Sequence, residues 1–226
     1  MGTSTIVQFG DDLAAYQVMA QNDTALVASL NLFRASELWG ARMGTFLAQA
    51  LPTPEFRSEA LLHTVQELRH TYLFDRRIRE LGGIPGPVPE EAIYLVRCAQ
   101  VGVGLPVERV EGSPERVLAP EECIRLFAGV HVIEARGART LRTFADAFPE
   151  DDPTRALLED IMGEEAIHAA SDGDALESFR QQGLASSVDA MLASCGENEP
   201  IAWRRFLNSA GEYVFRVEYE ALGARK

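Results

Sequence analysis

Hydrophobic and small residues recur every three or four positions over four long stretches of the chain. In the first stretch Leu30, Phe33, Gly40, Gly44 and Leu47 fall on one such line, which is typical of a helix with one buried face. The pattern predicts an all-α fold over residues 1–226 that forms a single domain. Its core helices are expected at about 23–51, 54–81, 120–148 and 152–176.

The segments between and after these stretches indicate the topology. Residues 84–118 are rich in proline, glycine and valine and are long enough to cross a bundle from end to end. Such a crossover is needed when the second and third helices of a four-helix bundle run parallel. A short lead-in helix is expected at 11–21. Two C-terminal helices are expected within 187–222, with a break near Gly196–Pro200.

Polar residues interrupt the apolar lines at matching places. Glu37 and Glu134 lie on the buried faces of the first and third stretches. Burying a lone carboxylate costs several kcal/mol, so each of these positions needs a cation nearby. The second and fourth stretches each carry Glu-x-x-His, a spacing that projects both side chains from one face of a helix. These pairs are Glu67 with His70 and Glu165 with His168.

The stretches also form an internal repeat. The segment Glu37-x-x-Gly40-Ala-Arg is matched by Glu134-x-x-Gly137-Ala-Arg, and a Glu-x-x-His pair follows each segment at nearly the same distance. Two antiparallel hairpins related by a pseudo-twofold axis would bring all six side chains to one centre. Two divalent cations would neutralise the four carboxylates, and mixed oxygen and nitrogen ligands favour iron or manganese.

This residue set resembles the metal site of the ferritin-like di-iron carboxylate superfamily. The resemblance implies a ferritin-like four-helix bundle with a long crossover and additional N- and C-terminal helices. It also implies two iron ions, with manganese as the alternative at one or both positions. The expected ligands of one ion are Glu37, Glu67 and His70. Those of the other are Glu134, Glu165 and His168, with one carboxylate of each Glu-x-x-His pair bridging the ions.

Four nearby residues extend the predicted site. Gln66 and Glu164 directly precede the glutamates of the two Glu-x-x-His pairs, and each could accept a hydrogen bond from the histidine of the opposite helix. Glu164 could equally remain solvated. His63 resembles the additional histidine of AurF-type N-oxygenases and is either a third nitrogen ligand or a hydrogen-bonded neighbour one turn away. His131, three residues before a predicted ligand, is a further candidate.

Two groups of residues are candidates for a substrate pocket, although both also fit ordinary packing. The first group is aromatic and consists of Phe33, Trp39, Phe127 and Phe144. The second group consists of Gly40, Gly44 and Gly137, which either leave cavity space or allow close contact between helices.

Within the superfamily, Gln66-Glu67-Leu68-Arg69-His70 and Ile133-Glu134-Ala135-Arg136 resemble motifs of the tRNA-modifying di-iron hydroxylases. The resemblance implies an O2-dependent oxidoreductase of the monooxygenase type, which hydroxylates or otherwise oxidises a small organic substrate. An external electron donor, a ferredoxin or a flavin reductase, is implied as well. The alternatives are a ferroxidase or iron-handling ferritin-like protein, a tRNA-modifying hydroxylase, and a bundle that binds metal only for its structure. Roles like those of the long-chain aldehyde-oxygenating enzymes or the small subunit of ribonucleotide reductase also stay open.

Composition narrows the expected partners. A formal net charge of −13 disfavours a nucleic-acid substrate, because such a protein needs a cationic surface. No apolar run is long enough to cross a membrane, and residues 1–12 lack the features of a signal peptide. Cys98, Cys123 and Cys195 form no Cys-x-x-Cys pair, which fits a reducing compartment. We therefore expect a cytoplasmic protein without a membrane partner.

Overall fold

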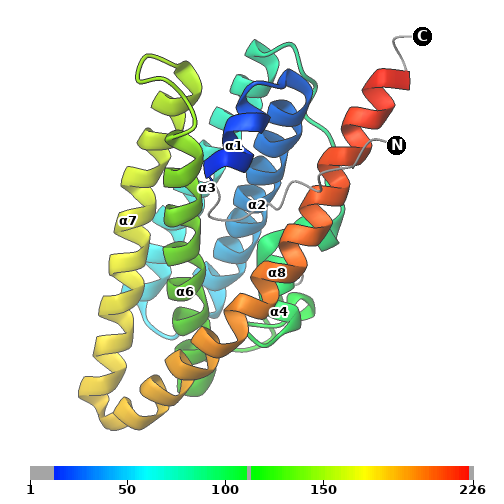
Figure 1. The fold of residues 1–226 in the computed structure, drawn as a ribbon. Coiled ribbons are helices and arrows are strands. Elements are labelled where there is room, and N and C mark those ends of the chain that lie inside the picture. Colours follow the sequence, from blue (N-terminus) through cyan, green and yellow to red (C-terminus); the bar gives the residue numbers. More distant parts are fainter. Residues whose placement is uncertain (1–12, 111–112, 224–226) are drawn as a thin grey trace.

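A computed structural model describes residues 13–110 and 113–223, and these are all-α (Figure 1). The expectation about a signal peptide concerns residues 1–12, which lie outside the described residues. The long helices begin and end within three residues of the expected positions. They are α2 (Asp23–Ala50), α3 (Pro54–Glu80), α6 (Pro120–Ala145) and α7 (Pro153–Phe179).

Local capping determines where three of these helices begin. The side chain of Asn22 accepts hydrogen bonds from the first backbone N–H groups of α2. Thr53 and Asp152 do the same for α3 and α7, and each is followed by a proline in the first helical turn. These caps satisfy N–H groups that have no partner within the helix.

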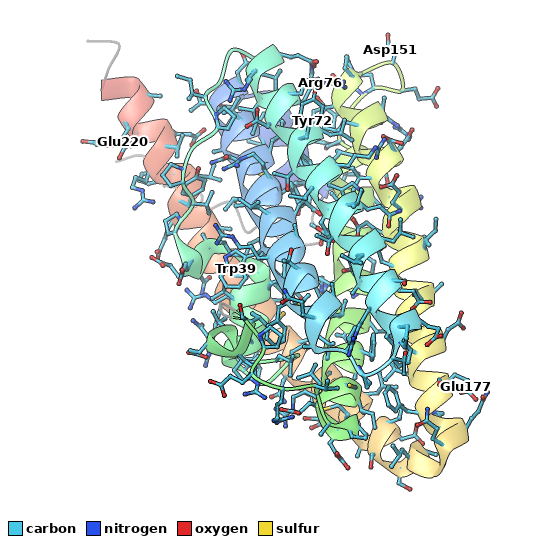
Figure 2. The ribbon with its side chains drawn as sticks, turned by 180° about the vertical axis from the view of Figure 1, so that it is seen from behind. Trp39, Tyr72, Arg76, Asp151, Glu177 and Glu220 are labelled. Atoms are coloured by element: carbon cyan, nitrogen blue, oxygen red, sulfur yellow. The ribbon has the colours of Figure 1, made fainter. Side chains whose placement is uncertain are left out.

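The bundle consists of two antiparallel hairpins, α2–α3 and α6–α7, joined by a long connection. In Figure 2 this connection leaves the end of α3 and passes along the bundle to α4 near the opposite end. It contains η1 (Glu90–Ala92), α4 (Tyr94–Gln100) and α5 (Val107–Val110). Near its end the Leu118 N–H donates a hydrogen bond to the Ala50 carbonyl, 2.8 Å away, at the end of α2. The crossover expected over residues 84–118 is therefore confirmed.

Two further helices pack against the bundle. The short helix α1 (Leu13–Ala20) places Tyr16 against Phe144 of α6, with the ring centroids 4.9 Å apart. After a turn at η2 (Arg180–Leu184), where Gly183 has a φ of 86°, α8 (Ala185–Gly223) runs back along the bundle (Figure 1). Only glycine adopts such a φ without strain, so Gly183 allows the chain to reverse.

The predicted break near Gly196–Pro200 is wrong, because α8 continues through Pro200. A proline inside a helix removes one hydrogen bond, and its ring presses on the carbonyl of the residue four positions earlier. That residue is Gly196, which has no side chain to obstruct a small adjustment. Burial of Glu199 and Ala202 against the bundle stabilises the helix beside the proline.

The apolar core has two parts, one toward each end of the bundle. One cluster includes Phe74 and Phe144, and the other includes Leu51 and Leu126. The polar residues singled out in the sequence lie between the two clusters along the helices. The apolar clusters limit access of water from both directions, which strengthens electrostatic interactions at the middle of the bundle. Among the described residues, no helix combines the length and apolar character needed to cross a membrane.

Candidate metal centre

All six residues predicted as ligands lie at the middle of the bundle. Each of the four long helices supplies at least one of them from its inward face. His70 is completely buried, and the side chain of Glu37, the most accessible of the six, is 12% exposed. The remaining four are Glu67, Glu134, Glu165 and His168, all of them buried.

The donor atoms form two groups that share one carboxylate. One group is Glu37, Glu67, His70 and Glu165, and the other is His63, Glu67, Glu134 and His168. Within each group, one donor atom from every residue lies within 4.8 Å of all the others. Glu165 also faces the second group, since its Oε2 is 3.5 Å from Nδ1 of His168. Glu67 and Glu165, the carboxylates of the two Glu-x-x-His pairs, thus lie between the groups.

The two Glu-x-x-His imidazoles have matching orientations. Nε2 of His70 is 2.9 Å from Oε2 of Glu164, and Nε2 of His168 is 3.0 Å from Oε1 of Gln66. These contacts direct Nδ1 of each ring toward the centre. An outer carboxylate or amide oxygen of this kind fixes the tautomer in which Nδ1 is free to bind a metal. Glu164 therefore contacts His70 and is not simply solvated.

His63 belongs to the second donor group, whereas His131 does not. Nε2 of His63 lies 2.8 Å from Oε1 of Glu67 and 3.8 Å from Oε1 of Glu134. Its ring stacks on that of His168, with centroids 3.7 Å apart. Burial and the neighbouring His168 lower the pKa of His63 to about 3, so its ring is neutral near pH 7. Nδ1 of His131 instead donates to the backbone carbonyl of Ala169, 3.1 Å away.

The cluster concentrates buried negative charge. Burial and the surrounding carboxylates raise the pKa of Glu67 and of Glu134 well above the usual range. Burial also opposes ionisation of Glu165, but contacts with Glu134 and the two histidines outweigh it and hold its pKa well below that range. Burial alone would lower the pKa of His70, yet the carboxylates of Glu165 and Glu37 raise it to about 10. In the metal-free protein, protons on His70, Glu67 and Glu134 thus reduce the negative charge of the cluster. Bound cations could neutralise the same charge in their place.

The unsatisfied atoms of the cluster fit a cation. Nδ1 of His168 is buried without a hydrogen-bond partner. Oε1 of Glu165 lies 3.1 Å from Nδ1 of His70 but makes no aligned hydrogen bond. Buried acceptor atoms of this kind are costly unless something pairs with them, and both face the other predicted ligands. Oxygen and imidazole donors suit iron or manganese, whereas the three cysteines are buried in the apolar core.

A cavity of about 100 Å³ adjoins the centre. Glu37, Glu67, Glu134 and Glu165 form part of its wall, and most of the rest is apolar. Phe33 lines this cavity, as the sequence suggested, and Phe127 lines a second one of about 80 Å³. The other two aromatic candidates, Trp39 and Phe144, are core residues instead.

The candidate glycines differ in their surroundings. A Cβ atom at Gly40 would lie 2.7 Å from the Glu67 carboxylate, and one at Gly44 would lie 2.2 Å from Oγ1 of Thr64. These two glycines therefore allow close contact between α2 and α3. A Cβ atom at Gly137 would have no other group within 4 Å, apart from its own helix backbone and chain neighbours. Gly40 and Gly44 also line cavities, but only at Gly137 among the three would a Cβ atom meet open space.

One polar cluster was missed from the sequence. Glu199 of α8 is buried and accepts hydrogen bonds from Tyr94 Oη at 2.6 Å and from Arg136 Nε at 2.8 Å. The Arg136 guanidinium also lies 4.9 Å from the centre of the Trp203 ring, which lines the cavity. This cluster holds α4, α6 and α8 together around the cavity. A signal was present, because Glu199 interrupts a buried line that includes Cys195 and Ala202.

No protein-family model matches the sequence, and no curated protein is significantly similar to it. Among solved structures, the chain is similar to a dodecameric thioferritin, the bacterioferritin-related protein from Bacteroides fragilis. The TM-score is 0.57 and the sequence identity 19%, over 75% of this chain and 96% of that chain. An identity this low concerns the fold alone. With the observed bundle and crossover, it shows that this chain has a ferritin-like fold.

Proposed function

We propose that the protein is a non-haem di-iron oxygenase or oxidase that uses O2 to hydroxylate or otherwise oxidise a small organic molecule. The observation that carries this proposal is the apolar cavity whose wall includes four carboxylates of the candidate metal centre. A molecule held there would lie directly beside the ions. A site built only to hold a structural metal has no need for such a cavity.

The donor groups suggest how two ions would be held. Glu37 and His70 would bind one ion, and Glu134, His168 and His63 the other, with Glu67 and Glu165 between them. Glu164 and Gln66 would hold the two Glu-x-x-His imidazoles in the binding orientation. When bound, a ferrous pair supplies electrons for the reduction of O2. The apolar residues around the cavity would exclude water and position the substrate.

A ferroxidase or iron-handling role is the second candidate. It is supported by the fold shared with the bacterioferritin-related protein, which is named a thioferritin. The apolar wall of the cavity, to which α8 contributes Trp203 and Phe206, favours the first candidate, because iron ions on their way to an oxidising site would gain nothing from apolar surroundings. A tRNA substrate is disfavoured by the net charge of −13. An external electron donor, a ferredoxin or a flavin reductase, is part of the proposal.

Metal counting and O2 uptake together test the proposal. The protein loaded anaerobically with ferrous iron should bind about two ions per chain, and Glu67→Ala should lose most of both because Glu67 lies in both donor groups. Glu121→Ala, an exposed position on the same helix as Glu134, is the matched control and should bind iron normally.

Excess ferrous iron distinguishes the two candidates. For an oxygenase, O2 uptake without reductant should stop once the bound iron is oxidised and should resume with a chemical reductant. Continued oxidation of many irons per chain would instead identify a ferroxidase. Failure to bind iron after anaerobic reconstitution would contradict both.

A further inference from the structure

The cavity beside the metal centre has a wall that disfavours charged molecules. Outside the centre itself, the described residues that line it include no lysine, arginine, aspartate or glutamate. Phe33, Val130, Leu141, Trp203 and Phe206 supply much of the surface. A charged group placed against this wall would lose its hydration without gaining a partner, so the cavity favours a neutral molecule.

Outside the metal centre, one hydroxyl on this wall is buried without a partner. Thr140 is 5% exposed, lines the cavity, and its Oγ1 makes no hydrogen bond. Other helical threonines of the chain satisfy their hydroxyl by donating to the carbonyl four residues earlier, as Thr64 and Thr71 do. The other hydroxyls whose bonds are known on this wall are also used, since Ser29 bonds the Ala25 carbonyl and Tyr94 bonds Glu199. The Thr140 hydroxyl, itself buried, therefore lies unpaired beside the cavity.

The spacing of the lining residues along α6 indicates how long such a molecule would be. Thr140 follows Glu134 by six residues, which corresponds to about 9 Å along a helix. Gly137 lies midway between them on the same wall and leaves open space where a side chain would stand. A molecule lying over Gly137 would thus reach from the Thr140 hydroxyl to the metal centre.

We infer that the cavity binds an uncharged, mainly apolar molecule with one hydrogen-bonding group, and that Thr140 pairs with that group while the apolar end faces the metal centre. This inference deepens the proposed function and rests on it for the statement that the bound molecule is the substrate. Thr140 is a positioning residue in this arrangement, and Gly137 determines the space available.

Three probes of similar ring size test the inference: benzyl alcohol, toluene and benzoate. Their binding is measured by calorimetry on ferrous-loaded protein without O2, so that no turnover occurs. Benzyl alcohol should bind roughly fivefold tighter than toluene, the usual effect of one hydrogen bond. In the metal-free protein, where no bound cation can pair with its charge, benzoate should bind at least about a hundredfold more weakly than benzyl alcohol. Equal affinities for the alcohol and toluene, or tightest binding of benzoate to the metal-free protein, would overturn the inference.

Variants locate the interaction. Thr140→Val should remove the advantage of benzyl alcohol and leave toluene binding unchanged, whereas Thr140→Ser should keep the advantage. Gly137→Leu should abolish binding of both probes while iron stoichiometry stays normal, and Gly137→Ala is its milder control. If Thr140→Val keeps the advantage, or if Gly137→Leu binds the probes as before, the inference is wrong.

The same titrations on metal-free protein separate the two proposals. Selective binding with the expected Thr140 and Gly137 effects, in a protein that neither binds iron nor takes up O2, would refute the proposed function and leave the cavity chemistry standing. Iron binding and O2 uptake without this selectivity would refute only the inference.

Discussion

The α2–α3 and α6–α7 hairpins present matching glutamates and Glu-x-x-His pairs, but equivalent positions around them differ. The residue before the Glu of the pair is Gln66 in one hairpin and Glu164 in the other. Because each accepts from the histidine of the opposite helix, His70 faces a carboxylate and His168 an amide. A carboxylate makes its histidine a more basic ligand. The two halves of the centre are therefore unequal in charge.

A second difference concerns the position seven residues before each histidine of the pairs. In α3 this is His63, which joins the donor group of His168, and in α7 it is Ile161, which is buried in the apolar core. The glycines of the repeat differ as well. Both line the cavity, but a Cβ atom at Gly40 would press on Glu67, whereas one at Gly137 would meet open space. A repeated scaffold thus places the ligands, whereas differences around the repeat pack one glycine tightly and leave space at the other.

The largest expected difference between the hairpins is in how protonation of their residues changes the stability of the metal-free protein with pH. The folded pKa of His70 is about 10, above the ordinary 6.5, so its stabilising contribution is complete below pH 6.5 and is lost as pH rises toward 10. The raised pKa values of Glu67 and Glu134 act in the same direction. His63 has the opposite sign, but its contribution changes only between about pH 3 and 6.5.

The melting temperature of the metal-free protein should therefore fall between pH 6.5 and 10, by about 2–4 °C for each kcal/mol lost. Calorimetric scans across this range provide the measurement. His70→Gln should flatten the slope, and iron loading should reduce it because cations replace the protons. A slope that is the same in the parent protein and in His70→Gln would contradict the assignment to His70.

Replacing Glu164 by glutamine gives both metal-site histidines an amide partner, so it should remove part of the difference between the two halves of the centre. Glu164→Gln should weaken iron binding by up to roughly tenfold, because the amide oxygen can still accept from His70 but leaves it a less basic ligand. A titration against a competing chelator measures this affinity. Asp160→Asn is the control, because it disturbs the Arg69 ion pairs at the surface without touching His70. Equal losses in both variants would show that the effect comes from the surface pairs.

Substitution by alanine should change the free energy of unfolding in opposite directions at Gly40 and at Gly137. Gly40→Ala forces a methyl group against the Glu67 carboxylate and should cost about 1–3 kcal/mol of unfolding free energy. Gly137→Ala meets open space and should stabilise the helix by up to about 1 kcal/mol through its higher helix propensity. Urea unfolding of the two variants beside the parent protein measures the difference. Similar destabilisation of both would mean that the Gly137 side is as tightly packed as the Gly40 side.

Much of this architecture could be predicted from the sequence because it depends on local periodicity. Apolar spacing, proline and capping residues placed the four long helices, and the Glu-x-x-His spacing placed each pair on one helix face. The internal repeat then predicted that six side chains converge, and the structure brings them together. The length of residues 84–118 was sufficient to predict the crossover.

Features that depend on contacts between distant residues were decided only by the tertiary structure. Pro200 indicated a helix end, yet α8 continues because Glu199 and Ala202 are buried beside it. The repeat gives Gly40 and Gly137 equivalent positions, and nothing local shows that a Cβ atom would press on a carboxylate at Gly40 but meet open space at Gly137. The place of His63 in the second donor group and the unpartnered hydroxyl of Thr140 have the same origin. Helix periodicity specifies which face a residue occupies, but the packing of other helices specifies what that face meets.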